Sequence, residues 1–353
     1  MPDAAPDRTP LSREGQTRMA RDAVGAIGRH RRGCVRHPVP MSIEVHGLTK
    51  VFVTGRRRQR RRIEAVRDLS LTVVAGERLA FIGPNGAGKS TSIKILTGIL
   101  HPTSGSATVL GVVPWEDRKR LARRIGTLFG QRSQLWTELS PRQSYRMLAA
   151  VYGLTAAEEI ERVGALGELL DASDLFDQPV RSLSLGQRMR CELAACMLHQ
   201  PEVLFLDEPT IGLDLLAKQR FREVVVRLNA ERGTTIFLTS HDVADIEHVA
   251  ERAVVVNHGS VIYDDDVATM RRTLLATKLI EVHGAGAIDV PQGAGVSVLA
   301  HEHGSLKLTV DTGLTPVRDV LDRLLDNRDL SDVSVMDPPL EQVIAEIYAE
   351  PRP

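Results

Sequence analysis

A glycine-rich loop between an apolar run and a helix-like run constrains this sequence more than any other feature. The loop consists of Gly83, Pro84, Asn85, Gly86, Ala87, Gly88, Lys89, Ser90 and Thr91. It matches G-x-x-x-x-G-K-[ST], a pattern whose glycines let backbone N–H groups and a helix N-terminus face one anion. The lysine neutralises phosphate charge, and the serine hydroxyl is a ligand for Mg²⁺. The loop therefore predicts a strand–loop–helix unit that holds a nucleoside triphosphate.

The composition is globular, and 353 residues, 42% of them hydrophobic, suffice for one large domain and a smaller one. Lys+Arg and Asp+Glu each number 45, so bulk charge gives no argument for nucleic-acid binding. The three cysteines, Cys34, Cys191 and Cys196, lack metal-binding spacing, and we expect Cys191 and Cys196 to be buried thiols. No uncharged apolar run reaches the about 18 residues that a membrane-spanning helix needs.

Residues 1–40 mix Pro, Arg, Asp, Gly and Ala with little periodicity. This is typical of a disordered leader without a catalytic role, or of sequence upstream of a start at Met41. From residue 42 apolar alternation predicts strands, which an arginine-rich segment at 55–62 interrupts. We interpret that segment as a solvated hairpin tip, or as a contact for acidic lipid headgroups or an acidic partner. It lacks interleaved aromatic residues, which argues against nucleic acid.

Two later apolar runs end in residues suited to phosphate chemistry. Residues 202–206 predict a central parallel strand that ends in Asp207 and Glu208, and residues 234–240 predict another that delivers His241. Adjacent side chains at a strand end point to opposite faces, so Asp207 can hold Mg²⁺ while Glu208 reaches the attacking water. We expect His241 at the same sheet edge, near the γ-phosphate.

Three segments separate the first loop from these strands. The segment 124–131, which ends in Gln131, predicts another short strand, and the stretch 140–177 has apolar residues at helical spacing. Residues 183–187 then lead into an apolar-faced helix. This junction offers backbone donors and the Ser184 hydroxyl to an anion, so we expect a second anion-binding surface there.

In this order the motifs resemble the ATP-binding subunit of an ATP-binding cassette (ABC) transporter, over residues 41–266. The resemblance implies an α/β P-loop NTPase fold, with a RecA-like parallel core sheet, an antiparallel β subdomain and a helical signature subdomain. It assigns further site residues: Phe52 against adenine, Gln131 as the Q-loop glutamine and a magnesium ligand, Ser184, Gly186 and Gln187 in the signature, Asp214 in the D-loop, and His241 as the switch histidine.

Two departures from the family pattern stand out. The signature carries Leu185 where glycine is usual, although the serine and glycine that approach phosphate are kept. The Q-loop is one residue longer than usual, so Gln134 is an alternative to Gln131. We prefer Gln131 because it follows the strand directly.

The resemblance also implies a mechanism with ATP and Mg²⁺ as cofactors, in which Lys89, Ser90, Gln131 and Asp207 hold the nucleotide and metal. Glu208 would polarise water and His241 would contact the γ-phosphate. Single copies of each motif predict a homodimer with two equivalent sites. We expect an integral-membrane permease as partner, a place on the cytoplasmic face of the membrane, and no nucleic acid. A soluble ABC ATPase acting on ribosomes or DNA is the alternative, and import is a lesser possibility than export.

Residues 267–353 differ in composition and predict a small α+β accessory domain. Its expected strands are 278–282, 296–299, 306–310 and 333–335, and its expected helices are 316–325 and 340–348. The tail resembles cassettes that serve ABC-2-type exporters, including drug and antibiotic efflux systems. The domain is either a dimer-stabilising appendage or a regulatory sensor.

Overall fold

The structure, a computed structural model, describes residues 40–54, 61–130, 133–274, 277–286, 288–325 and 330–336. Several predictions therefore fall outside the described residues. They are the leader up to residue 39, most of the arginine-rich segment, Gln131, and the final helix at 340–348.

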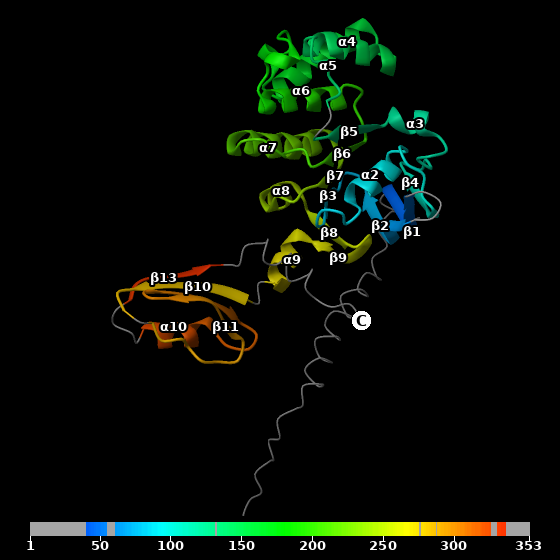
Figure 1. Cartoon of the computed structure of the whole chain (residues 1–353). Coiled ribbons are helices and arrows are strands. Elements are labelled where there is room, and N and C mark those ends of the chain that lie inside the picture. The colour runs from blue at the N-terminus through cyan, green and yellow to red at the C-terminus, as the bar shows by residue number, and fades with distance from the viewer. Residues whose placement is uncertain are drawn as a thin grey trace, which may run out of the picture. The chain divides into compact units, whose positions relative to one another are not determined.

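A six-stranded sheet forms the centre of the cassette (Figure 1). Its order is β5 (Ile125–Phe129), β6 (Val203–Asp207), β7 (Thr235–Thr239), β3 (Arg78–Ile82), β8 (Arg252–Asn257) and β9 (Ser260–Asp266). The first five strands are parallel, and β9 runs antiparallel to β8. Strands β6, β7 and β3 are almost wholly buried, as their continuous apolar runs predict.

Helices cover both faces of this sheet, with α2 on one side and α7 and α8 on the other (Figure 1). The alternating side chains of strand β6 show why both faces need cover. Val203 and Phe205 pack in the core that contains α2, whereas Leu204 and Leu206 pack in the core that contains α6 and α7. These helices are α2 (Lys89–Leu96), α6 (Leu185–Met197), α7 (Leu215–Arg232) and α8 (Val243–Val249), and a short α3 (Arg118–Ala122) precedes β5.

The predicted antiparallel β subdomain forms a separate three-stranded sheet. It has the order β2 (Arg61–Val74), β1 (Met41–Thr54) and β4 (Ser104–Val109). Strands β1 and β2 form a hairpin whose last described pair is Thr54 with Arg61. The arginine-rich segment thus joins two paired strands.

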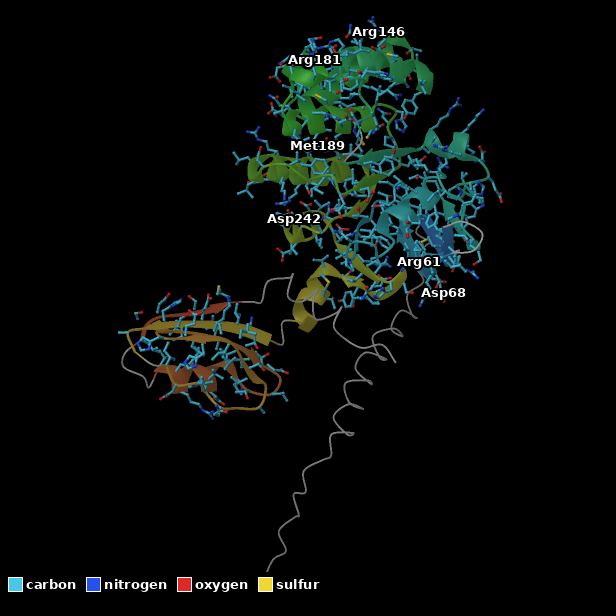
Figure 2. All side chains as sticks on the ribbon, viewed as in Figure 1. Arg61, Asp68, Arg146, Arg181, Met189 and Asp242 are labelled. Carbon is cyan, nitrogen blue, oxygen red and sulfur yellow. The ribbon has the colours of Figure 1, made fainter. Side chains whose placement is uncertain are left out.

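The predicted helical insert between residues 140 and 177 is confirmed. It contains α4 (Pro141–Tyr152), α5 (Ala156–Leu169) and a 3-10 turn at Ser173–Leu175, and it packs against α6. Tyr145 and Phe176 meet edge to face in this core, with ring centroids 5.0 Å apart. Arg146 and Arg181, labelled in Figure 2, lie on its exposed surface.

The C-terminal sheet is antiparallel, with the order β11 (Val296–Glu302), β12 (Ser305–Asp311), β10 (Thr277–Gly284) and β13 (Leu330–Met336). Helix α10 (Val317–Leu325) buries Val320 and Leu324 against it. These elements match the predicted strands and the first predicted helix. Helix α9 (Val267–Leu274) instead packs Val267 and Met270 with Ile82 and Val255. A domain boundary at residue 266 stays a prediction.

None of the helices in the described ranges combines the length and apolar character needed to cross a membrane.

Candidate functional site

The predicted phosphate loop connects β3 to α2. Gly88 caps α2 with a left-handed backbone (φ 102°) and provides no side-chain cap. A Cβ at Gly88 would lie 2.2 Å from the Ala65 carbonyl oxygen, so only glycine fits. Because no side chain caps the helix, the first N–H groups of α2 are left for an anion, and the loop fits a phosphate.

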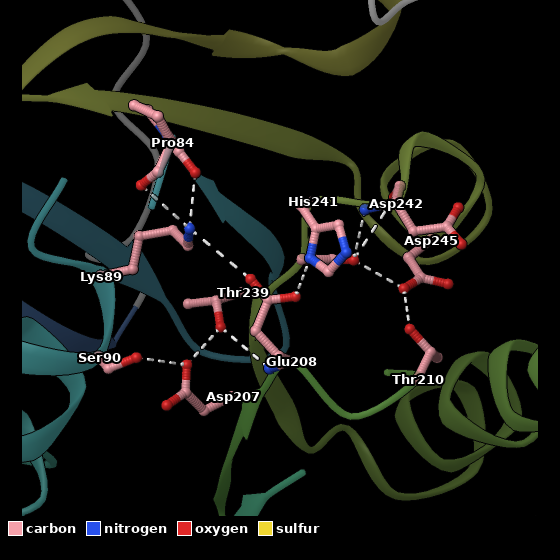
Figure 3. A network of polar contacts seen from close by, with 12 residues as sticks. Pro84, Lys89, Ser90, Asp207, Glu208, Thr210, Thr239, His241, Asp242 and Asp245 are labelled. Atoms are coloured by element: carbon pink, nitrogen blue, oxygen red, sulfur yellow. Dashed lines mark hydrogen bonds and ion pairs between the residues drawn. The ribbon is translucent and has the colours of Figure 1, made fainter. Parts of the chain in front are cut away.

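Lys89 points back over this loop (Figure 3). Its side chain is only 7% exposed, and Nζ donates to the Gly83 carbonyl oxygen at 2.6 Å. The same Nζ lies 3.6 Å from Glu208 Oε1. The ammonium group therefore sits between the loop and the carboxyl end of β6, where phosphate charge would need neutralising.

Asp207 and Ser90 form a cluster of oxygen atoms beside the loop. Both the Ser90 hydroxyl, at 3.2 Å, and the Thr239 hydroxyl, at 2.7 Å, donate to Asp207 Oδ1. Carboxylate and hydroxyl oxygens suit Mg²⁺, which usually takes few protein ligands and keeps phosphate and water oxygens. Within the described residues, no three His, Cys, Asp or Glu side chains are grouped to hold a metal by themselves. The donor set thus fits a metal that arrives with a nucleotide.

Glu208 and His241 form a close pair of polar side chains in the site. Glu208 Oε2 lies 2.6 Å from His241 Nδ1, and Glu208 adopts a left-handed backbone (φ 51°). Its N–H donates to Thr239, both to the carbonyl oxygen and to Oγ1 at 3.1 Å. This turn sends Asp207 and Glu208 toward different partners, which confirms that the two carboxylates diverge.

Asp242, which follows His241, lies beside two cationic side chains, Lys218 and Arg222. Burial by itself would raise the pKa of Asp242. A hydrogen bond from Lys218 at 2.6 Å and the charges of Lys218 and Arg222 outweigh this effect and bring that pKa below its usual range. The loop that carries His241 is therefore anchored by charge.

Gln134, the alternative to Gln131, is held elsewhere. Its side-chain amide donates to the Thr127 carbonyl oxygen at 2.6 Å and to Cys196 Sγ at 2.8 Å, between β5 and α6. These contacts of the Gln134 amide hold it against β5 and α6 rather than against Ser90 or Asp207. The assignment of Gln131 remains a prediction.

The signature residues form a second, separate group. Ser184 caps α6: its Oγ accepts from the Gln187 N–H at 3.2 Å, and Gln187 Oε1 accepts from the Ser184 N–H at 2.9 Å. Asp214 caps α7 by accepting from the Ala217 N–H at 2.8 Å. Ser184, Gly186, Gln187 and Asp214 line one pocket of about 280 Å³. No residue of the phosphate loop lines that pocket.

Phe52 is half-buried on β1, and Lys50 Nζ lies 5.2 Å from the centre of its ring. Its proposed role against adenine stays a prediction. Sequence reasoning missed Thr239, which holds both Asp207 and Glu208. The available signal was a hydroxyl residue at the end of the apolar strand 235–239.

Comparison with known proteins places the chain among transporter ATPases. A family model described as "ABC transporter" matches residues 66–211. The ABC transporter ATP-binding protein NatA of Bacillus subtilis is 31% identical over 201 residues, 57% of this chain and 81% of that protein. The daunorubicin/doxorubicin resistance ATP-binding protein DrrA of Streptomyces peucetius is 33% identical over 245 residues, 69% and 71% of the two chains.

Solved structures agree on the fold. The dimeric, post-hydrolysis ATP-binding cassette MJ0796 with ADP and Pi superposes with a TM-score of 0.57 at 23% identity, covering 64% of this chain and 98% of that one. The cbiO1 protein from Clostridium perfringens, part of the ABC transporter complex cbiONQ, has a TM-score of 0.57 at 26% identity, covering 67% and 94%.

Proposed function

The chain belongs to the ABC transporter ATP-binding proteins, a family of ATPases, and we propose that it powers an ABC-2-type exporter by closing as an ATP-dependent homodimer. The observation that carries the proposal is the meeting of Lys89, Ser90, Asp207, Glu208 and His241 at the carboxyl edge of one parallel sheet. The similarity to DrrA, which is named for daunorubicin/doxorubicin resistance, supports the direction of transport.

The residues of one cassette divide the work of phosphoryl transfer to water. Lys89 would leave the Gly83 carbonyl for phosphate oxygens, and Ser90, Asp207 and Gln131 would hold Mg²⁺. When bound, Mg²⁺ neutralises charge on the phosphates. Glu208 accepts a hydrogen bond from the attacking water and polarises it.

His241 is proposed to link the carboxylate to the γ-phosphate. Its Nδ1 faces Glu208, so its other ring nitrogen can donate to a phosphate oxygen. This arrangement makes hydrolysis depend on the contact between His241 and Glu208.

The signature pocket supports a head-to-tail homodimer with two equivalent sites. Ser184, Gly186 and Asp214 line a pocket that the phosphate loop of the same chain does not reach. A second copy would bring them onto the nucleotide. The dimeric state of the cassette MJ0796 supports this arrangement.

The proposed partner is an integral-membrane permease, which would hold this subunit at the cytoplasmic face of the membrane and select the cargo. The accessory sheet after residue 277 is proposed to stabilise the dimer. Purification of the full chain from a native membrane extract tests the partner. A polytopic membrane protein should accompany it, and recovery of ribosomes or DNA instead would contradict the proposal.

Glu208→Gln tests the catalytic assignment. The amide keeps the size of the side chain but is a poor proton acceptor, so turnover should fall at least about 100-fold. ATP should then trap a dimer, visible by size-exclusion chromatography with light scattering. The matched control is Glu202→Gln at the other end of β6, where the Glu202 carboxylate pairs with Arg124. Normal hydrolysis by Glu208→Gln would contradict the assignment.

A further inference from the structure

A buried polar cluster lies directly behind the Glu208–His241 pair. Its members are Asp245, Ser240, Thr210 and Arg222, whose exposed fractions are 1%, 1%, 3% and 6%. They come from α8, the loop after β7, the loop after β6, and α7. Polar side chains this deeply buried persist in folded proteins when they satisfy one another.

Asp245 is the centre of this cluster (Figure 3). Its Oδ2 accepts from Thr210 Oγ1 at 2.5 Å, a contact drawn in Figure 3, and from Ser240 Oγ at 2.7 Å. Its Oδ1 accepts from Arg222 Nε at 2.6 Å. Arg222 also lies 3.3 Å from Asp242. One carboxylate therefore joins three chain segments, and the guanidinium group balances its charge.

The joined segments are the ones that carry the catalytic pair. Glu208 lies two residues before Thr210, and His241 directly follows Ser240. The left-handed backbone of Glu208 is unfavourable by about 1 kcal/mol for a residue with a side chain, so the neighbouring contacts must hold it. His241 is 61% exposed, so packing against its ring cannot fix its place.

We propose that Asp245 is a positioning residue for hydrolysis: it ties the loop of Glu208 to the loop of His241 and so maintains the contact between their side chains. This inference rests on the proposed function. Asp245 contacts no reacting atom. Its effect on the reaction passes through Thr210 and Ser240.

The sharpest test is a matched pair at Thr210 in the full chain. Thr210→Val keeps the shape but removes the donor to Asp245, whereas Thr210→Ser keeps the hydroxyl. Thr210→Val should lower kcat about 10-fold to 100-fold, because small displacements of catalytic groups have effects of this size. Affinity for ATP in an equilibrium binding assay should change less than about twofold, and Thr210→Ser should restore kcat.

A double variant separates positioning from stability. Asp245→Leu with Arg222→Met removes both charges, and replacing a buried ion pair by apolar groups often leaves the stability of a protein unchanged. We expect a thermal midpoint near that of the wild type with kcat still reduced. If the double variant had both a wild-type thermal midpoint and a wild-type kcat, the cluster would have only a structural role.

The control is Glu77→Gln. Glu77 is another carboxylate paired with arginine, bonded to Arg252 at 3.0 Å and to the Val74 N–H at 2.8 Å, at the opposite end of β3 from the phosphate loop. This variant should leave kcat unchanged even where it lowers the thermal midpoint. A wild-type kcat for Thr210→Val would overturn the inference alone, whereas a wild-type chain without ATP hydrolysis would overturn the proposed function.

Discussion

The sequence predicts an anion-binding helix N-terminus at two loop–helix junctions of this chain, but the two junctions differ in structure. The phosphate loop ends at Gly88, whose left-handed backbone starts α2 without a side-chain cap. The signature loop ends at Ser184, whose side chain and that of Gln187 cap α6 reciprocally. The first helix end is left open to an anion, and the second is closed by its own residues.

This difference indicates different roles for the two N-termini. At α2, backbone N–H groups can meet a phosphate without first breaking a bond. At α6, the cap uses Ser184 Oγ as an acceptor, so its O–H remains able to donate. The signature therefore fits a contact through its hydroxyl group, made after a second copy approaches, whereas the phosphate loop fits nucleotide within one chain.

The largest predicted effect comes from comparing alanine substitutions of one glycine at each junction. Gly88→Ala adds a Cβ that would lie 2.2 Å from a carbonyl oxygen, in a conformation that disfavours side chains, so affinity for ATP should fall at least about 100-fold. Gly186→Ala meets only the Ala217 Cβ, at 2.8 Å. The Gly186→Ala variant should retain the affinity of a single chain for ATP, but its rate of ATP turnover should fall. Equal losses of affinity in isothermal titration would remove the distinction.

A smaller effect tests the hydroxyl of the signature. Ser184→Asp and Ser184→Asn both preserve an N-cap, so the free energy of unfolding should change by less than about 0.5 kcal/mol. The carboxylate of the Ser184→Asp variant would repel a phosphate. ATP turnover by this variant should therefore fall about 100-fold, well below turnover by Ser184→Asn. Steady-state hydrolysis and urea denaturation measure the two quantities. Equal turnover in the two variants would show that residue 184 does not face phosphate.

The last prediction concerns chemical labelling in the body of α6, and not activity. Burial raises the pKa of both Cys191 and Cys196 to about 12 from 9.0. In a Cys34→Ser background at pH 8, iodoacetamide should therefore label the folded chain about 1,000-fold more slowly than the urea-unfolded chain. The rate should rise about tenfold per pH unit, because the thiolate is the reactive form. Fast labelling of the folded chain would show that the helix opens behind its capped end.

The predicted site residues that the structure brings together lie near the carboxyl ends of buried strands. Lys89 and Ser90 begin the helix after β3 and its loop, Asp207 ends β6 and Glu208 follows it, and His241 comes two residues after β7. Parallel strands end at one sheet edge, so residues far apart in sequence meet there without further information. Thr239 and Asp245 escaped prediction because their partners lie on other segments, and a lone hydroxyl or carboxylate has many ordinary explanations.

The sequence by itself determined the fold class, the phosphate loop and the order of the motifs, because local spacing and apolar periodicity encode strands, helices and their ends. Only the tertiary structure decided that Glu208 turns left-handed toward His241, and that Gln134 bonds between β5 and α6. It also revealed that one buried carboxylate joins two loops. Glu208 and His241 are 33 residues apart in sequence, Thr210 and Asp245 are 35 apart, and Gln134 and Cys196 are 62 apart, so no local pattern specifies these contacts.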